Sequence, residues 1–248
     1  MPATGGITFN AKIGDRCVGW AADHLEPGVT ARNENDEYNA ALSSLSCIGN
    51  VAIVRSGDAK GAKGFVTGKH GGCEHLLCYF DDETMEKMTI GDTIDVRSQG
   101  QGMKLLDYPE ILLRNMSPEL LDKMNITEEN GKLKVGVAKI VPAAIMGSGL
   151  GASTSYFGDY DITLHDKAIT QQYGLQDLRF GDIVAIQDAD TRFGRNYLTG
   201  AVTIGVVVHS DCILAGHGPG VTTLMTCKTP LIEAVIDEHA NLADYFVK

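Results

Sequence analysis

The segment Ser56-Gly-Asp-Ala-Lys-Gly-Ala-Lys-Gly-Phe-Val-Thr-Gly-Lys-His-Gly-Gly-Cys-Glu-His75 lies between two short, mostly apolar runs, Val51–Arg55 and His75–Phe80. Six of its twenty residues are glycine, which favours turns over continuous helix. Short β-branched runs separated by Gly, Asp and Asn predict strands joined by hairpins and tight loops. This pattern is typical of small β-barrels and sandwiches.

The same pattern continues through most of the chain. Further strand-like runs are Gly64–Val66, Thr93–Arg97, Lys132–Val141, Asp182–Gln187 and Ala201–Val208. Helices are predicted for Asp36–Leu45, for Ser117–Met124 with its Ser-Pro-Glu start, and for Pro230–Tyr245, whose apolar residues recur with a helical period. We therefore expect a mainly β (α+β) protein with small barrel or sandwich parts and a few short helices.

A related pattern occurs once in each half of the chain. Ile90-Gly-Asp-Thr-Ile-Asp-Val96 and Phe180-Gly-Asp-Ile-Val-Ala-Ile186 share an apolar-Gly-Asp turn that leads into an alternating strand. We place a boundary near Asn130–Lys132. It gives a β-rich N-terminal half (1–130) with the glycine-rich loop and a β-rich C-terminal half (131–248) with a C-terminal helix. A single domain is the alternative.

Composition excludes several classes of function. The net charge is −11, from 32 acidic and 21 basic residues, and such a surface repels nucleic-acid backbones. No apolar run approaches the length of a membrane span, and the first residues lack the basic and apolar regions of a signal peptide. The six cysteines form no Cys-x-x-Cys pair. We expect a cytoplasmic protein with free thiols that binds neither nucleic acid nor membrane.

Four glycine-rich or polar segments carry the candidate functional residues. The first is the opening segment, in which Lys69, His70 and Glu74 surround Gly71-Gly72. Its glycines permit close backbone approach and an amide nest for an anion, to which Asp58 and Lys60 would add polar groups. A hairpin with solvated charges is the structural alternative.

The second segment runs from Val207 to Gly220 and contains two histidines. His209 ends an apolar strand, and His217 lies in Gly-His-Gly-Pro-Gly. Two histidines across a turn can meet at one metal ion or one substrate. A structural role at the strand end is the alternative for His209, and Cys212 between them makes a Cys/His nucleophile conceivable.

The third segment follows the strand-like run Asp182–Gln187. Asp188 and Asp190 alternate and would share one face of a continued strand, where two carboxylates can hold a hard cation or divide acid and base roles. Arg195 could bind a substrate carboxylate bidentately. An acidic turn leaving a strand is the alternative.

The fourth segment is Met146-Gly-Ser-Gly-Leu-Gly-Ala-Ser-Thr-Ser155. It has no Gly-Lys-Ser/Thr and no complete dinucleotide fingerprint, so we expect no nucleotide cofactor. Its glycines, Gly149 among them, are better suited to a lid or an amide cradle for an anion. Gly158-Asp-Tyr-Asp161 adds further acids directly afterwards.

Several motifs together resemble an uncharacterised prokaryotic family that is classed as a domain of unknown function. They are Gly57–Gly61, Val66–Gly72, Leu106–Pro109, Phe180–Ile186 and Gly216–Thr223. The resemblance covers most of the chain and implies a largely β architecture with barrel-like parts. To a lesser extent, at Gly181-Asp182 and Gln187-Asp188, the chain is similar to the β-rich acetamidase/formamidase hydrolases.

The leading functional hypothesis is a metal-assisted hydrolase of an amide-type bond in a small polar metabolite. A divalent ion (Zn, Mn or Fe) would be bound by His70, Asp188, Asp190, His209 and His217. The catalytic candidates are Lys69, Glu74 and Arg195, and the substrate-binding candidates are Asp58, Lys60, Gly71, Gly72 and Gly149. The alternatives are a metal-free acid/base lyase or isomerase, a non-catalytic small-ligand binding protein and a purely structural protein. A homo-oligomer is the expected assembly.

Overall fold

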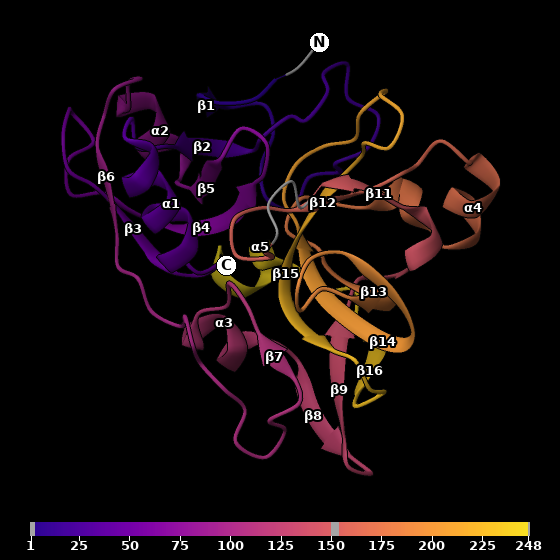
Figure 1. The fold of residues 1–248 in the computed structure, drawn as a ribbon. Coiled ribbons are helices and arrows are strands. Elements are labelled where there is room, and N and C mark those ends of the chain that lie inside the picture. The colour runs from indigo at the N-terminus through magenta and orange to yellow at the C-terminus, as the bar shows by residue number, and fades with distance from the viewer. Residues whose placement is uncertain (1–2, 150–153, 248) are drawn as a thin grey trace.

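The computed structural model describes residues 3–149 and 154–247, and within them the strands form three sheets (Figure 1). The mainly β fold is confirmed, with one sheet nearly closed into a barrel. The strands are β1 (Ile7–Thr8), β2 (Gly28–Ala31), β3 (Val51–Val54), β4 (Lys63–His70), β5 (His75–Tyr79), β6 (Ile94–Val96), β7 (Leu112–Leu113), β8 (Ile126–Glu129), β9 (Lys132–Val137), β10 (Lys139–Pro142), β11 (Met146–Gly149), β12 (Tyr160–Ile162), β13 (Ile183–Asp190), β14 (Asn196–Val207), β15 (Gly220–Cys227) and β16 (Ile232–Ile236). The helices are α1 (Asp36–Leu45), α2 (Asp82–Lys87), α3 (Pro118–Lys123), α4 (Lys167–Gln172) and α5 (Leu242–Phe246), with 3-10 turns η1 (Ala143–Ile145) and η2 (Leu175–Asp177).

The three sheets divide the strands largely by their position in the chain. The first has the order β1-β2-β5-β4-β3-β6, and each of its neighbouring pairs is antiparallel. The second has the order β10-β13-β14-β15-β12-β11, with β7 also paired to β15, and the third has the order β16-β9-β8. In Figure 1 the indigo and purple first sheet lies beside the orange and yellow strands of the second.

A continuous hydrophobic core joins the first sheet to the second. Phe65 and Leu77 of the first sheet belong to the same buried cluster as Ile204 and Val221 of the second. Leu76, the neighbour of Leu77, points to the opposite face of β5 and joins a smaller cluster. The first sheet is therefore apolar on both faces, and one face packs against the C-terminal half.

Local sequence signals explain two of the predicted helices. The Asn35 side chain accepts a hydrogen bond from the Tyr38 amide at the start of α1, and Ser117 does the same for Leu120 at the start of α3. Both predictions are confirmed within a residue or two.

No helix in residues 3–149 and 154–247 is long and apolar enough to cross a membrane.

The helix predicted for Pro230–Tyr245 is wrong over most of its length. Its first part forms β16, which pairs in parallel with β9, and only Leu242–Phe246 is helical. Val235 and Ile236, which would lie on the apolar face of such a helix, are 42% and 62% exposed. Backbone pairing with β9 therefore overrides the helical period of the apolar residues.

A glycine in β4 sets the distance between the first two sheets. A Cβ atom on Gly68 would lie 2.3 Å from Cγ1 and 2.7 Å from Cβ of Val208, just beyond the end of β14. Val208 is 1% exposed, so it has little space into which to move. The missing side chain lets β4 approach the segment that follows β14, and that segment carries His209.

We expect Gly68→Ala to lower the free energy of unfolding by about 2 kcal/mol, because the added methyl group overlaps a buried valine. Chemical denaturation of Gly68→Ala, Val208→Ala and the double variant measures this. The double variant should lose less than the sum of the single losses, because Val208→Ala removes the overlapping Cγ1. Additive losses would contradict the proposed contact.

Candidate metal centre

Ionisable side chains from both halves of the chain converge where the first and second sheets meet. His24 and Glu26 lie in the segment before β2, and His70 is the last residue of β4. Asp159 and Asp161 alternate around Tyr160 at the start of β12 and so share one face of that strand. The group is completed by two histidines that flank a loop, His209 after β14 and His217 before β15.

The contact between His209 and Asp159 is the most unusual in the group. His209 Nε2 lies 2.7 Å from Asp159 Oδ2, and the two side chains are 1% and 3% exposed. Yet neither atom has a hydrogen-bond partner of acceptable geometry among the described residues. Nδ1 of His209 lies 2.9 Å from the Ser210 carbonyl oxygen. In the tautomer that donates to this carbonyl, the Nε2 lone pair faces a carboxylate oxygen, and a shared cation would satisfy both atoms.

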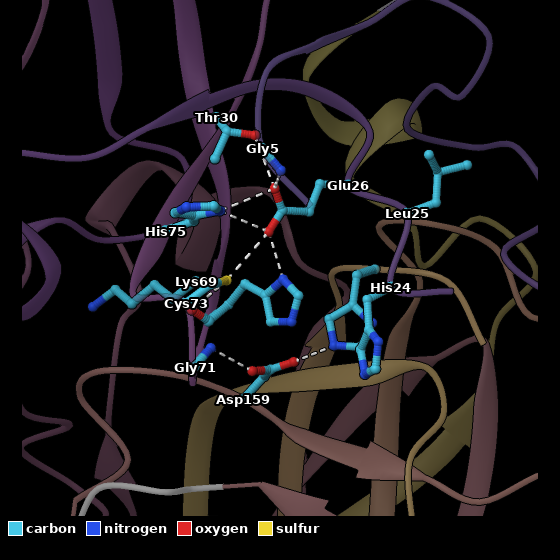
Figure 2. A network of polar contacts seen from close by, with 12 residues as sticks. Gly5, His24, Leu25, Glu26, Thr30, Lys69, Gly71, Cys73, His75 and Asp159 are labelled. Carbon is cyan, nitrogen blue, oxygen red and sulfur yellow. Dashed lines mark hydrogen bonds and ion pairs between the residues drawn. The ribbon is translucent and has the colours of Figure 1, made fainter. Parts of the chain in front are cut away.

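The other carboxylate oxygen of Asp159, Oδ1, has a hydrogen-bond donor of its own. Oδ1 accepts a hydrogen bond of 2.7 Å from the Gly71 amide, a contact drawn in Figure 2. Burial acts to raise the pKa of Asp159, but His209, His70 and the Gly71 amide hold it below its ordinary value. The carboxylate is therefore ionised, with Oδ2 directed at His209.

Glu26 orients His70 from the side away from Asp159. Nδ1 of His70 lies 2.5 Å from Glu26 Oε1, and Glu26 also accepts hydrogen bonds from the Gly5 amide and the Thr30 hydroxyl. Figure 2 shows Glu26 held among Gly5, Thr30, Cys73 and His75. Because Nδ1 is engaged by a carboxylate, Nε2 of His70 is left for the interior of the cluster, an arrangement common for metal-binding histidines.

Four imidazole rings pack closely around this point. The ring centroids of His70 and His209 are 4.2 Å apart, and the His24 ring lies 4.9 Å from His209 and 5.6 Å from His70. The His217 ring is 5.2 Å from His24. Such a cluster would be strongly repulsive if all four rings were charged, and the buried carboxylates beside it attract a cation.

The ligand atoms are spaced as metal binding requires. Within each of three groups, one ligand atom per residue lies within 4.8 Å of the others: His24, His70 and His209; Asp159, Asp161 and His209; His24, Asp161 and His217. Bonds of about 2.0–2.2 Å from one ion to nitrogen and oxygen place neighbouring ligands roughly 3–3.5 Å apart. The separations in these groups are near that value, but His209 Nε2 and Asp159 Oδ2, at 2.7 Å, would have to move apart to bind one ion.

Gly220 makes room for the closest pair. A Cβ atom at this position would lie 1.8 Å from Asp159 Oδ2 and 2.3 Å from His209 Nε2. Any other residue at the start of β15 would occupy the space in which these two atoms meet. The Gly-His-Gly-Pro-Gly segment thus supplies His217 and also the space beside His209.

The structure brings together only some of the residues predicted from sequence. His70, His209 and His217 meet, and Gly71 contacts the cluster through its amide. Asp188 and Asp190 do not join them: Asp188 accepts a hydrogen bond from the Gly200 amide, and Asp190 pairs with Arg192 at 2.8 Å. The carboxylates at the cluster are Asp159 and Asp161 instead.

The three predicted catalytic residues lie outside the cluster. Lys69 is fully buried but extends away from Asp159 and His24 (Figure 2), and its Nζ donates to Asn115 Oδ1 and the Tyr156 carbonyl. Burial lowers the pKa of Lys69 to about 7. Glu74 lies in the turn between β4 and β5 with a left-handed backbone. Arg195 is exposed and donates to the Met146 carbonyl.

The remaining substrate-binding candidates are also separate from the histidines. Asp58 and Lys60 are exposed in the turn before β4, whereas His70 ends that strand, about 20 Å further on. Gly72 is an exposed turn residue. Gly149 ends β11 and pairs with Tyr160, and residues 150–153 of its glycine-rich segment lie outside the described residues.

Sequence reasoning missed His24, Glu26, Asp159 and Asp161 as site residues. A signal was present in Asp159-Tyr-Asp161, because two functional residues separated by one share a face in extended chain. In His24-Leu-Glu26 the spacing gives no such signal, because His24 has a left-handed backbone in a turn. The pairing of these two segments with His70 and His209 depends on long-range packing, which the local patterns do not contain.

Comparison with known protein families accounts for nearly the whole chain. Residues 1–122 match the N-terminal model, and residues 123–246 the C-terminal model, of a domain of unknown function, DUF4438. The chain belongs to the DUF4438 family. The resemblance to an uncharacterised family is thereby confirmed, and the DUF4438 halves both contribute residues to the histidine cluster.

One solved structure is closely similar to this DUF4438 protein. It is described as the crystal structure of TM1086, with 50% sequence identity and a TM-score of 0.94. The match covers 99% of this chain and 86% of that chain. No curated protein matches the sequence.

We expect the Glu26 contacts to give a stability maximum between pH 4.5 and 6.5 in chelator-treated protein. Burial acts to raise the pKa of Glu26, but its contacts with His70 and His75 outweigh burial and lower the pKa from 4.5. The contribution of Glu26 to the free energy of unfolding is therefore complete above pH 4.5 and is lost under acid conditions. Cys73 and then Glu26 raise the pKa of His75 from 6.5 to about 9. The contribution of His75 to the free energy of unfolding is therefore complete below pH 6.5 and is lost as the pH rises through 9.

Glu26→Gln should therefore cost about 3 kcal/mol of unfolding free energy within that pH window and less on either side. Urea denaturation at several pH values measures the difference between wild type and variant. The exposed Glu34→Gln is the control and should show no such window. A loss that does not change with pH would show that Glu26 acts by packing alone.

Proposed function

We propose that this protein is a metal-dependent hydrolase that acts on a small polar molecule. The observation that carries the proposal is the 2.7 Å approach of His209 Nε2 and Asp159 Oδ2, both buried and both without a hydrogen bond among the described residues. A protonated His209 would pair with Asp159 directly, whereas a neutral His209 that donates from Nδ1 to the Ser210 carbonyl leaves both facing atoms in need of a partner. A divalent cation is the partner that satisfies a neutral imidazole and a carboxylate together.

The donor atoms favour a particular group of metals. His209, Asp159 and Asp161 would form the first ligand set, with one nitrogen and two oxygens, and the His70 ring packs beside His209. Imidazole and carboxylate ligands without a thiolate suit Zn, Mn or Fe. The second nitrogens of the histidines face Glu26 and the Ser210 carbonyl, which would hold the rings in place and set their tautomers.

The reaction class follows from what such an ion supplies. A divalent ion with an open ligand position lowers the pKa of bound water towards about 7 and polarises a carbonyl oxygen. Hydrolysis of an amide-type bond uses both effects. The chain's own part is to hold the ion, exclude competing ligands and admit the substrate.

The limited solvent exposure of the histidine cluster supports a small substrate. His217 is 39% exposed and His24 15% exposed, so the cluster opens towards solvent on their side. A cavity of about 650 Å³ elsewhere in the described part of the chain is lined by other residues. A smaller one of about 190 Å³ includes Asp23 and Cys212, which lie close to His24 and to the loop carrying His217.

A metal-free lyase or isomerase is the second candidate. The observation that favours it is the 2.5 Å contact between Glu26 and His70, which raises the pKa of His70 despite burial. A histidine whose pKa is shifted in this way can exchange protons with a substrate. This alternative predicts activity that is insensitive to chelators.

We expect protein purified without an affinity tag to contain Zn, Mn or Fe, and His209→Ala to lose it. The loss should be at least about tenfold in metal per chain, because the variant removes a buried ligand. Elemental analysis after dialysis measures this. His239→Ala is the matched control, because His239 is 70% exposed and lies outside the cluster. Equal metal content in the two variants would overturn the metal centre.

We expect metal-loaded wild type to hydrolyse members of a panel of small amides, and both chelator treatment and Asp159→Asn to abolish this. Product amine or ammonia released over time is the measured quantity. His239→Ala should retain wild-type rates. Chelator-resistant turnover would support the acid/base alternative. Metal binding without turnover of any amide would support a binding protein instead.

A further inference from the structure

The two carboxylate oxygens of Asp161 face two different sets of ligand atoms. Oδ1 lies 3.7 Å from Nε2 of His209, the nitrogen that approaches Asp159. Oδ2 lies 3.4 Å from Nδ1 of His217 and 3.8 Å from Nε2 of His24. A carboxylate between two groups of imidazole nitrogens has the geometry of a bridging ligand.

The group around Oδ2 is a complete set of three ligand atoms. Nε2 of His24 and Nδ1 of His217 are 3.3 Å apart, so all three separations lie between 3.3 and 3.8 Å. These spacings are close to those of neighbouring ligands on one ion. His24 and His217 take no part in the first ligand set, so the outer set does not depend on His70, His209 or Asp159.

We propose that the centre holds two metal ions bridged by Asp161. The inner ion is bound by His209, Asp159 and Asp161 Oδ1, with the His70 ring beside them. The outer ion is bound by His24, His217 and Asp161 Oδ2. This inference rests on the proposed function, because it extends the same centre by a second ion.

The charges of the cluster are consistent with two ions. Glu26, Asp159 and Asp161 are 1–6% exposed and contribute three negative charges when ionised. Two divalent ions contribute four positive charges, and one hydroxide between them makes the total zero.

The two positions differ in exposure, which predicts different roles. The inner ion lies among side chains that are at most 7% exposed, whereas His217 on the outer ion is 39% exposed. The outer ion therefore exchanges more readily and is the one that a substrate oxygen reaches. In two-metal hydrolytic sites the ions are about 3.5–4 Å apart and stabilise both reacting oxygens.

Stepwise loading of the metal-free full chain with Mn²⁺ tests this proposal. Native mass spectrometry counts bound ions, and electron paramagnetic resonance reports magnetic coupling between nearby Mn²⁺ ions. We expect two ions per chain, with a coupled spectrum at the second equivalent. His217→Ala should keep one tightly bound ion, lose the coupled spectrum and weaken second-ion binding by more than about 100-fold.

Two further variants keep the test decisive. Asp161→Asn is nearly isosteric and should also remove the coupling, whereas His239→Ala should bind two coupled ions. Saturation of wild type at one ion, or two uncoupled ions unaffected by His217→Ala, would overturn the dinuclear centre and leave the single-ion hydrolase intact. Failure to bind any ion would instead refute the proposed function itself.

Discussion

Three buried carboxylates set the main physical constraint at the junction of the two halves. Glu26, Asp159 and Asp161 are nearly inaccessible to solvent, and ionised carboxylates in such a place need positive charge and hydrogen bonds around them. Backbone amides of Gly5, Gly71 and Gly218 provide part of this. The histidines provide the rest, either as protonated partners or, as we propose, through bound metal ions.

The surrounding fold holds these groups at fixed positions. Gly68 lets β4 approach Val208, and this contact places His70 beside His209. On the other side of β4, Lys69 donates to the Tyr156 carbonyl, three residues before Asp159. The strand that carries one ligand is thus tied to the segment that carries another by the hydrogen bonds of Lys69.

Much of the fold was predictable because its signals are local. Asn35 and Ser117 cap the helices that follow them, and glycines mark the turns between short strands. The C-terminal segment shows the limit of such signals. Val235 and Ile236 fit a helical period, yet pairing with β9 places them in a strand, because hydrogen bonds to a distant segment outweigh local preference.

The sequence alone determined a β-rich, acidic chain and the glycine-rich character of its loops, and it predicted His70, His209 and His217 as site residues. Only the tertiary structure decided which carboxylates join them. Asp188 and Asp190 had the same alternating spacing as Asp159 and Asp161, but one pair contacts Gly200 and Arg192 and the other contacts histidines. Spacing shows which side chains share a face, whereas the packing of distant strands determines what that face meets.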